Sequence, residues 1–572
     1  MPNPKHWNIP PLISSEADSA LSKFPPILRQ ILFNRGYATD AEARAYLNAK
    51  PDFNPDPFQM TGMRETITRI QTAIQNNEPI AIYGDYDVDG VTSTALLVET
   101  LTTFNANVRG YIPNRFEEGY GLNNEAMDKL KADGVQLVIT VDCGIRSPNE
   151  ALHARTLGLD LIISDHHHPS EGDLPAAFAI INPKQPGDIY PDKDLAGVGI
   201  AYKIAEALLN NGQQTADNDQ RLYSLLDLVA LGTVADLAPL VGENRILVRK
   251  GLRQMKQTLR QGLFSLAAVS EIKLDKVTAG NIGFSLGPRL NAAGRLKEAL
   301  AAYELLITKD PARAGQLAQE LNIQNRERQG ITREIQARAE EIALTDDPKA
   351  YLLFAAHKDF NSGVIGLAAS RLTDTYYRPA IVASKGEEET RGSCRSIPEF
   401  HITDALDQCA DLLVRHGGHA AAAGFTVKNE NLSALVTRLK SIAAEKLSSA
   451  DLRPTVTADA GVSLVDIRPE LFEKCLKYLE PTGYGNPTAA FVARNVKVKN
   501  ARAIGADAKH LKLLLEDDEH YTHDAIGFRL GEWQKKMTPR VDILFTYEVN
   551  EYNGRIGYQL NLKDIKEAGA TN

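Results

Sequence analysis

The chain has 572 residues, of which 43% are hydrophobic and 24% are charged. This composition is ordinary for a folded globular protein, and the length exceeds what one hydrophobic core supports, so we expect three to five domains. The formal net charge of −9 gives no bulk electrostatic support for a nucleic-acid partner. A basic groove can nevertheless coexist with an acidic exterior.

The sequence also argues against membrane insertion and disulfide stabilisation. Its apolar runs stop short of the roughly 18–20 residues that a spanning helix needs. The first residues, "MPNPKHWNIPPL", lack the basic-then-apolar pattern of a secretory signal. The four cysteines are scattered and form no C-x-x-C pair, so neither a disulfide framework nor a structural zinc site is indicated. We therefore expect a cytoplasmic protein without a membrane partner.

The first half of the chain predicts a helical lead-in followed by an α/β domain. Residues 1–50 are punctuated by prolines and read as helical. From 51 to 305, apolar β-type runs alternate with helical segments, which predicts a parallel sheet. The runs are "PIAIYG" (79–84), "NVRGYIP" (107–113), "VQLVITV" (135–141), "LDLIIS" (159–164) and "AFAIIN" (177–182).

A long helix is predicted next, within residues 306–348. Between Pro311 and Ala343, apolar residues such as Leu317, Leu321 and Ile335 recur at helical spacing among many charges. Its length and charge favour a connector between domains, although a core helix of one domain would show the same periodicity.

The last 220 or so residues predict two further domains. Residues 349–450 begin with two apolar β-type runs, "KAYLLFAA" and "RPAIVAS", and form a second α/β unit. Residues 451–572 contain short strands separated by turn residues, including the hairpin signal Asn553-Gly554. Several short strands with few helices predict a small barrel similar to an OB-fold, which binds nucleic acids in many proteins.

Three aspartates follow the first predicted strand at alternate positions, in "GDYDVDG" (84–90). An EF-hand loop begins in the same way, and Gly90 fits its sixth position. Its twelfth position requires a bidentate glutamate, but Leu96 occupies it here. The run also follows a strand rather than a helix, so a calcium loop is a poor interpretation.

The following predicted strands also end in polar residues that could bind a metal. One ends at Asp142, the next ends in Asp165-His166-His167-His168, and Asp236 follows an apolar helical run. The carboxyl ends of parallel strands lie along one edge of a sheet, where ligands bind. Each residue alone has an ordinary explanation, as a helix cap or in an exposed loop, but together they predict one site.

Crowded carboxylates repel one another, which raises their pKa values and destabilises the fold unless cations lie between them. Carboxylate oxygens with some imidazole suit Mn²⁺ or Mg²⁺, and the absence of cysteine ligands argues against a thiolate zinc site. The pattern therefore predicts a site for Mn²⁺ or Mg²⁺, with room for two ions.

The chain resembles the DHH phosphoesterase superfamily, named for the triplet at Asp165-His166-His167. Four segments resemble its motifs in order: "GDYDVDG" (84–90), "VDCG" (141–144), "SDHH" (164–167) and "GTVADLAPL" (232–240). Five later segments are similar to the RecJ family of bacterial single-strand-specific exonucleases: "GPRLNAAGRL" (287–296), "GVIGLAASRL" (363–372), "GSCRSI" (392–397), "GGHAAAAGF" (417–425) and "LEPTGYGNP" (479–487). Cys394 and Thr482 depart from the usual residues, and neither is a predicted metal ligand.

The resemblance implies a set of metal ligands and their roles. The implied ligands are Asp85, Asp87, Asp89, Asp142, His166 and Asp236. Asp142 would bridge two ions, and His167 would contact the scissile phosphate or support the ligands. Asp85 is either a ligand or an orienting partner of its neighbours.

Further residues are candidates for binding the substrate. Arg391, Ser393, Arg395 and Ser396 form a compact group of donors suited to a terminal phosphate, although an ordinary solvated loop would also contain them. His419 follows two glycines, where the backbone can approach a phosphate closely. Arg115, Arg289 and Arg295 are candidate backbone clamps. In the predicted barrel, the candidates are Tyr547, Tyr552, Phe528 and Lys512.

The resemblance implies 5′→3′ degradation of single-stranded DNA to 5′-mononucleotides, in DNA repair and recombination. Single-strand-binding protein and a helicase are implied partners, and we expect a monomer. A nanoRNase or cyclic-dinucleotide phosphodiesterase of the same superfamily is an alternative, although such chains typically lack the C-terminal barrel. A non-catalytic replication scaffold is a third interpretation, opposed by competent side chains at every implied ligand position.

Overall fold

The computed structural model describes residues 5–48, 54–114, 121–170, 172–210, 215–296, 299–552 and 555–570. Its contacts divide the chain into two compact units. One, the catalytic unit, comprises Arg44–Glu327 and Leu479–Pro487. The other, the barrel-containing unit, comprises Met1–Ala43, Arg328–Tyr478 and Thr488–Asn572.

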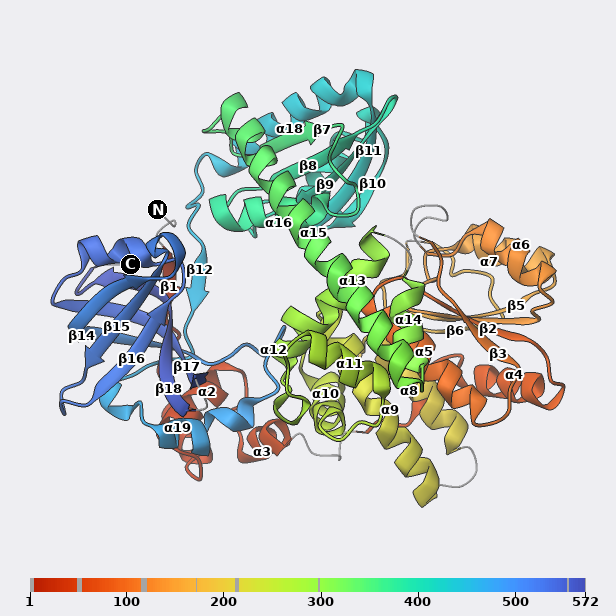
Figure 1. Cartoon of the computed structure of the whole chain (residues 1–572), viewed down its shortest axis with the longest axis horizontal. Coiled ribbons are helices and arrows are strands. Elements are labelled where there is room, and N and C mark those ends of the chain that lie inside the picture. The colour runs from red at the N-terminus through yellow and green to blue at the C-terminus, as the bar shows by residue number, and fades with distance from the viewer. Residues whose placement is uncertain are drawn as a thin grey trace. The chain divides into compact units, whose positions relative to one another are not determined.

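The catalytic unit contains a five-stranded parallel sheet (Figure 1). The strands are β2 (Ile80–Gly84), β3 (Val108–Tyr111), β4 (Leu137–Val141), β5 (Asp160–Ser164) and β6 (Ala179–Ile181). Each lies within one of the five predicted apolar runs. The spatial order is β3-β2-β4-β5-β6, so the direction of chain progression reverses between β2 and β4. A doubly wound sheet binds its ligands at this switch point.

Both faces of this sheet are covered by helices, which explains why its strands are apolar throughout. Ile80, Ile82 and Ile139 pack on one side with α4, α5 and α8, whereas Ala81 and Val138 pack on the other with α6 and α7. Parallel sheets are buried on both faces for this reason. These helices are α4 (Met63–Gln75), α5 (Val88–Thr102), α6 (Asn124–Ala132), α7 (Pro148–Thr156) and α8 (Gly197–Leu209).

A group of helices completes the catalytic unit. They are α9 (Ala216–Ala235), α10 (Gly242–Met255), α11 (Gln261–Val269), α12 (Ala279–Asn281), α13 (Gly287–Leu296) and α14 (Leu300–Ile307). Residues from α9 to α14 belong to the same hydrophobic core as α5 and α8. The second half of α9, from Leu225 to Val234, is buried, so this helix has no polar face there.

The long predicted helix is present as α15 (Pro311–Asp346), a continuous helix of 36 residues. Pro311 occupies its first position, and the Asp310 carboxylate accepts a hydrogen bond from the Ala312 amide at 2.9 Å. Proline at this position and an aspartate cap are both typical of helix starts. The helix passes from one compact unit to the other between Glu327 and Arg328.

The barrel-containing unit holds a second, mixed sheet of the order β10-β11-β9-β8-β7. Its strands are β7 (Leu353–His357), β8 (Ala380–Lys385), β9 (Glu389–Arg395), β10 (Leu413–His419) and β11 (Ala422–Lys428). The accompanying helices are α16 (Ile365–Tyr376), α17 (Ile402–Asp407) and α18 (Leu432–Leu447). Phe400, Phe425 and Leu439 are among the buried residues that join these helices to the sheet.

The C-terminal residues form a closed five-stranded barrel. The pairing runs β14-β15-β16-β18-β17 and closes from β17 back to β14, with β13 (Ala460–Gly461) beside β14. The strands are β14 (Ala490–Ile504), β15 (His510–Glu516), β16 (Thr522–Gly527), β17 (Arg540–Tyr552) and β18 (Arg555–Glu567). Short α19 (Pro469–Lys474) precedes them. The barrel confirms the predicted OB-like fold; the hairpin signal Asn553-Gly554 lies outside the described residues.

The N-terminal lead-in is not purely helical. It contains α1 (Ser15–Ala20), α2 (Pro26–Asn34) and α3 (Asp40–Asn48), but also strand β1 (His6–Asn8). β1 pairs in parallel with β12 (Thr455–Thr457). Trp7 is 1% exposed, and its indole nitrogen donates to the Asp564 carboxylate at 2.7 Å. Helical periodicity cannot reveal a three-residue strand whose partner lies so far along the chain.

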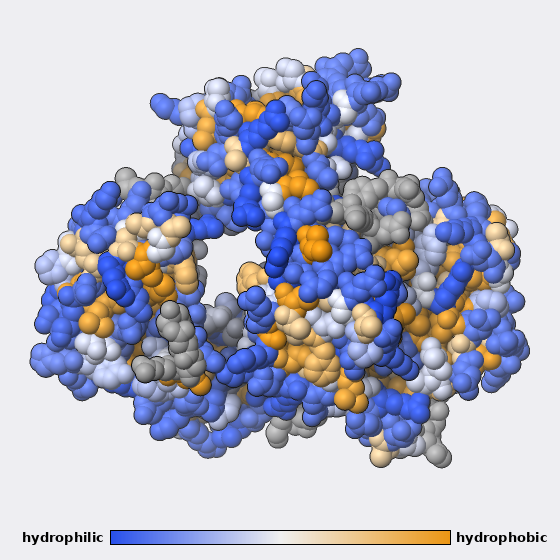
Figure 2. Space-filling model, in the orientation of Figure 1, coloured by the Kyte–Doolittle hydropathy of each residue, from blue (hydrophilic) through white to orange (hydrophobic). Residues whose placement is uncertain are grey.

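Within the described ranges, no helix combines the length and the apolar character that a membrane span requires. The surface drawn in Figure 2 is mostly hydrophilic, with apolar residues scattered among the charged ones. Such scattered apolar side chains are normal on folded proteins.

The position of Trp7 predicts that β1 stabilises the barrel-containing unit. Trp7→Ala removes a buried indole and the hydrogen bond to Asp564, so we expect a loss of about 3–5 kcal/mol in the free energy of unfolding, measured in urea. Asn8→Ala, on the same strand and exposed, is the control and should change stability by less than about 0.5 kcal/mol. Equal effects of the two substitutions would contradict this role.

Candidate metal centre

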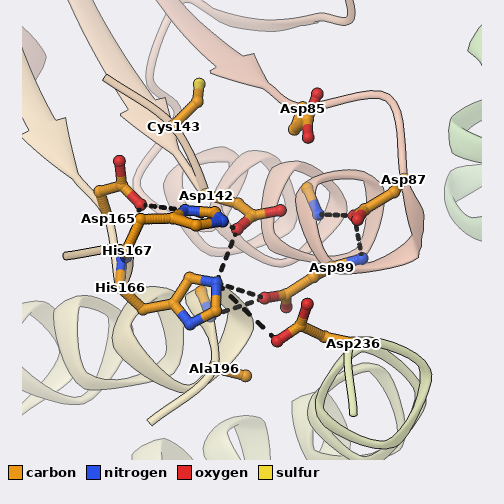
Figure 3. Close-up of polar contacts among 12 residues, drawn as sticks. Asp85, Asp87, Asp89, Asp142, Cys143, Asp165, His166, His167, Ala196 and Asp236 are labelled. Atoms are coloured by element: carbon orange, nitrogen blue, oxygen red, sulfur yellow. Dashed lines mark hydrogen bonds and ion pairs between the residues drawn. The ribbon is translucent and has the colours of Figure 1, made fainter. Parts of the chain in front are cut away.

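The predicted acidic residues and histidines come together at the switch point of the parallel sheet (Figure 3). Asp85 and Asp142 directly follow β2 and β4, the two strands between which the chain order reverses. His166 and His167 follow β5, and Asp236 caps the C-terminus of α9. Three groups of side chains each place their ligand atoms within 4.8 Å of one another: Asp85, Asp87 and Asp142; Asp142, His166 and His167; and Asp89, His166 and Asp236.

Asp87 organises the turn between β2 and α5. Its side chain caps α5 by accepting hydrogen bonds from the amides of Asp89, at 2.8 Å, and Gly90, at 3.2 Å. A Cβ atom at Gly90 would lie 2.4–2.7 Å from the backbone of Asp85, so glycine is required there for the helix to start this close to the strand. The turn thereby brings all three aspartates of the motif to one rim.

Asp89 is held by the N-terminus of another helix. It is fully buried, and its two carboxylate oxygens accept hydrogen bonds from Gly197, at 2.7 Å, and Val198, at 2.8 Å, in the first turn of α8. A Cβ atom at Gly197 would lie 2.9 Å from this carboxylate and 2.9 Å from the Asp142 Cβ. Backbone amides at a helix N-terminus favour a negative charge, so Asp89 is oriented and partly compensated.

Asp165 supports the two histidines rather than joining the ligand groups. It is 2% exposed and accepts hydrogen bonds from the amides of Ile145, His166 and His167. It also lies 2.8 Å from Nδ1 of His167. This network fixes the loop after β5 and turns both imidazole rings toward the carboxylates.

His166 faces three carboxylates at once. Its Nε2 atom lies 3.0 Å from Asp142, and 3.8 Å from both Asp89 and Asp236. Asp142 adopts a left-handed backbone conformation, with φ of 63°, directly after β4. Such a conformation is uncommon for residues other than glycine and is found repeatedly at functional sites.

Burial dominates the electrostatics of the cluster. Burial, with the charge of Asp87, raises the pKa of Asp89 to about 7. Burial and the neighbouring aspartates raise the pKa of Asp236 to about 9, and they raise the pKa of Asp142 well above its ordinary value. Burial, with the charge of His167, lowers the pKa of His166 to about 3, so this imidazole is neutral. The protein alone therefore cannot hold all these carboxylates ionised at neutral pH.

His167 behaves differently because Asp165 lies beside it. Burial opposes its charged form, but the hydrogen bond to Asp165 and the charge of that carboxylate raise the pKa of His167 above its ordinary value. The same pair lowers the pKa of Asp165 despite burial. One neutral and one more basic imidazole thus lie side by side, with ring centroids 4.5 Å apart.

The donor set fits a hard divalent cation. Asp142 Oδ1 and His166 Nε2 are buried and make no hydrogen bond with any described residue. Carboxylate oxygens that converge with a neutral imidazole nitrogen form a donor set that suits Mn²⁺ or Mg²⁺. Cys143 does not join them, since it lies apart from the cluster in Figure 3 and burial keeps its pKa well above the ordinary value of a thiol.

The predicted donors for a terminal phosphate are placed on β9 and β10 of the barrel-containing unit. Along β9, Thr390 and Cys394 are fully buried, whereas Arg391, Ser393 and Arg395 occupy the alternate positions that point to the other face. Arg395 donates to the Ser393 hydroxyl at 3.2 Å. In the register, Ala422 pairs with both Arg395 and His419, so these two side chains lie on the same face of the sheet.

Other predicted substrate residues meet different partners. The Ser396 hydroxyl donates to the carbonyl of Phe400 at 2.6 Å, which ties it to the following loop. Arg289, in the catalytic unit, donates to the Asn322 side chain and the Ser285 carbonyl. Burial and nearby Arg326 lower the pKa of the Arg289 guanidinium. Arg115 lies outside the described residues.

The barrel candidates are divided between core and surface. Tyr547 is 4% exposed and belongs to the interior, so it is poorly placed to stack on a base, whereas Phe528 is 54% exposed. Lys512 forms an ion pair with Asp524 at 3.0 Å. The side chain of Tyr552 lies outside the described residues.

The sequence did not predict the residues that hydrogen-bond the segments carrying the proposed metal ligands. The Asn291 side chain accepts a hydrogen bond from the Val88 amide at 3.1 Å, which joins the "GPRLNAAGRL" segment to the first acidic motif. The amides of Gly197 and Val198 were also missed. A backbone donor leaves no signal in the sequence except the glycine that makes room for it.

Comparison with known proteins agrees with this geometry. Three family models match: the DHH family, N-terminal domain, at residues 79–233; the DHHA1 domain at 349–445; and the RecJ OB domain at 458–564. The switch-point site and the first of these matches define a phosphoesterase of the DHH class.

Similar proteins over the whole chain narrow the assignment. The chain is 40% identical over 543 residues to "Single-stranded-DNA-specific exonuclease RecJ" of Bacillus subtilis, with 94% of this chain and 68% of that protein covered. It is 33% identical over 564 residues to the protein of the same name from Escherichia coli, with 95% and 96% covered. The chain belongs to the RecJ family.

Solved structures show the same relationship. A crystal structure of RecJ from Thermus thermophilus, in complex with Mn²⁺, matches with a TM-score of 0.82 at 28% identity, covering 99% of this chain and 80% of that one. A structure of exonuclease RecJ bound to manganese matches with a TM-score of 0.60 at 32% identity, covering 70% and 99%.

The raised pKa values predict how pH and metal act on stability. In the unfolded chain these aspartates have a pKa of about 4. In the folded metal-free protein the pKa is about 7 for Asp89 and about 9 for Asp236. At a pH between the unfolded and folded values, the folded protein therefore binds protons that the unfolded chain has lost. The contribution of these groups to stability therefore falls as pH rises through that window. A cation replaces the protons, so its stabilising effect should grow with pH.

Scanning calorimetry with saturating Mn²⁺ or with a chelator tests this prediction. We expect the increase in Tm caused by Mn²⁺ to be larger at about pH 8 than at about pH 6. An increase of the same size at both values would contradict it. Asp89→Asn, which removes one titrating ligand, should reduce the difference.

Proposed function

We propose that this protein is a metal-dependent exonuclease that degrades single-stranded DNA in the 5′→3′ direction and releases 5′-mononucleotides. The observation that carries the proposal is the convergence of three groups of Asp and His ligands at the switch point of a DHH-class sheet. The relatives named as single-stranded-DNA-specific exonucleases, and the neighbours solved with Mn²⁺ or Mg²⁺, support the substrate and the cofactor.

The residues that would hold the metal are Asp85, Asp87, Asp89, Asp142, His166 and Asp236. Asp142 is the proposed bridge, because it belongs both to the group with Asp85 and Asp87 and to the group with the histidines. When bound, Mn²⁺ or Mg²⁺ lowers the pKa of a water molecule and neutralises charge on the phosphate. Asp85 is proposed as a ligand rather than an outer support, because its carboxylate lies in one group with those of Asp87 and Asp142.

His167 has a separate role in this mechanism. Asp165 raises its pKa and fixes its orientation, so the ring can donate a hydrogen bond as an imidazolium. We propose that His167 binds a non-bridging oxygen of the scissile phosphate, whose charge increases during in-line attack. Such charge-assisted donors stabilise a phosphoryl transition state.

Recognition of the 5′ end is assigned to the face of β9 that carries Arg391, Ser393 and Arg395. Ser393 and Arg395 lie side by side there, with His419 on the same face of the sheet. A guanidinium and a hydroxyl are suitable donors for a terminal phosphate. Arg289, on α13 of the catalytic unit, is proposed as a clamp for the DNA backbone.

The remaining expectations belong to the same proposal. They are the domain limits 1–50, 51–305, 306–348, 349–450 and 451–572, the Arg115 clamp, action in DNA repair and recombination, cytoplasmic location, a monomeric state, and cooperation with single-strand-binding protein and a helicase. The OB barrel would bind the incoming DNA strand.

The second candidate function is a phosphodiesterase of the same superfamily that acts on dinucleotides. Comparing the hydrolysis rates on two-residue and long DNA distinguishes the two functions.

The metal assignment predicts the behaviour of Asp142→Ala. Removing the proposed bridge should reduce exonuclease activity at least about 10³-fold, while relief of carboxylate crowding leaves the fold intact or more stable. Activity on labelled single-stranded DNA and the circular dichroism melt are the measurements. Asp128→Ala, an exposed aspartate on α6, is the control and should retain activity. Retained activity in Asp142→Ala would refute the assignment.

The polarity is tested on oligonucleotides labelled at either end. We expect a 5′ label to be released early as a mononucleotide, and a 3′ label to remain on progressively shorter strands. Ser393→Ala together with Arg395→Ala should slow digestion of 5′-phosphorylated DNA more than that of 5′-hydroxyl DNA, because the lost donors serve the phosphate. Early shortening from the 3′ end would contradict the proposed direction.

A further inference from the structure

The N-terminus of α8 orients the Asp89 carboxylate. Both carboxylate oxygens accept backbone hydrogen bonds from it, at 2.7 Å from Gly197 and 2.8 Å from Val198. These two hydrogen bonds therefore fix the orientation of the carboxylate, and its remaining lone pairs face His166. A shift of this helix end would rotate Asp89 away from the other ligands, so its position must itself be secured.

Asn244, on α10, secures the segment that precedes this helix end. It is 1% exposed, and its Nδ2 atom donates to the carbonyl of Asp194 at 2.6 Å. Its Oδ1 atom accepts the amide of Ala196 at 3.4 Å. The side chain thus binds one carbonyl and one amide, and the two partners fix which way its amide group faces. Ala196 and Leu195 are themselves fully buried, so loss of Asn244 would leave the Ala196 amide without this acceptor.

The neighbouring residue Glu243 binds the same helix further along. Its carboxylate forms a buried ion pair with Lys203 of α8 at 2.6 Å and accepts the Tyr190 hydroxyl at 2.6 Å. The Glu243 amide donates to Asp192 at 2.7 Å. The first turn of α10 therefore holds α8 at Lys203 and holds the loop that leads into it.

We propose that Asn244 is a positioning residue for metal binding, acting on Asp89 through the amides of Gly197 and Val198. Partners that orient a metal ligand typically contribute a factor of about 10–100 to metal affinity. Asn244 is not a member of the three ligand groups, and its two hydrogen bonds go to the segment before α8, so we expect it to act through the position of that helix end. The inference rests on the proposed role of Asp89 as a ligand.

The test is the affinity of the full-length protein for Mn²⁺, measured by isothermal titration calorimetry on metal-free protein. Asn244→Ala should raise the Mn²⁺ dissociation constant by roughly 10-fold or more. Its exonuclease activity should recover at high Mn²⁺, and its KM for DNA should stay unchanged. A wild-type Mn²⁺ affinity in Asn244→Ala would overturn the proposal.

Asn429→Ala is the matched control. Asn429 likewise binds two backbone carbonyls, those of Gly386 and Glu387, at 3.0 and 2.8 Å, in the barrel-containing unit. We expect this variant to lose stability but to keep its Mn²⁺ affinity, because its partners belong to neither α8 nor α10. An equal loss of affinity in both variants would reduce Asn244 to a general structural role and overturn the proposal.

Two further variants keep the outcome interpretable. If Asn244→Ala does not fold, Asn244→Ser replaces it, because serine adds no charge and has one polar atom where asparagine has two. Weakened Mn²⁺ binding is again expected, and unchanged binding refutes the proposal. Asp89→Asn tests the underlying assignment. Normal Mn²⁺ binding by Asp89→Asn would contradict the proposed role of Asp89 in the metal site. Normal Mn²⁺ binding by the Asn244 variants alone would contradict only the proposed positioning role of Asn244.

Discussion

Repulsion among carboxylates is the constraint on which the rest of this structure depends. Asp89 and Asp142 are almost completely buried, and Asp236 lies against them at the same rim. Without a cation, burial raises the pKa values of these groups and favours protonation, which removes the charge that a metal ion needs. A divalent cation would therefore stabilise the ionised form of the cluster, and it would link folding to metal affinity through the same charges.

The surrounding protein acts as a set of supports for that ionised state. Asp87 caps α5, the first turn of α8 donates two amides to Asp89, and Asp165 organises the loop that carries His166 and His167. Each support uses backbone amides, which provide partial positive charge without a titrating group. Side chains further away, such as Asn244 and Asn291, then hold those backbone segments in place.

Sequence patterns were sufficient for much of the fold. Five apolar runs predicted the five strands of the parallel sheet, and helical periodicity predicted α15 within a few residues of its observed ends. The closed barrel was also predicted from short strands and turns. The strand β1 was missed, because three residues that pair with a distant segment have no local periodicity to reveal them.

The sequence by itself determined that these carboxylates and imidazoles meet at one site, because residues that follow successive parallel strands reach the same edge of the sheet. Only the tertiary structure decided how they are oriented and protonated. That depends on the amides of Gly197 and Val198, on Asn244, and on burial, which lowers the pKa of His166 while Asp165 raises that of His167. Backbone donors and desolvation arise from packing between segments far apart in the chain, so no local pattern records them.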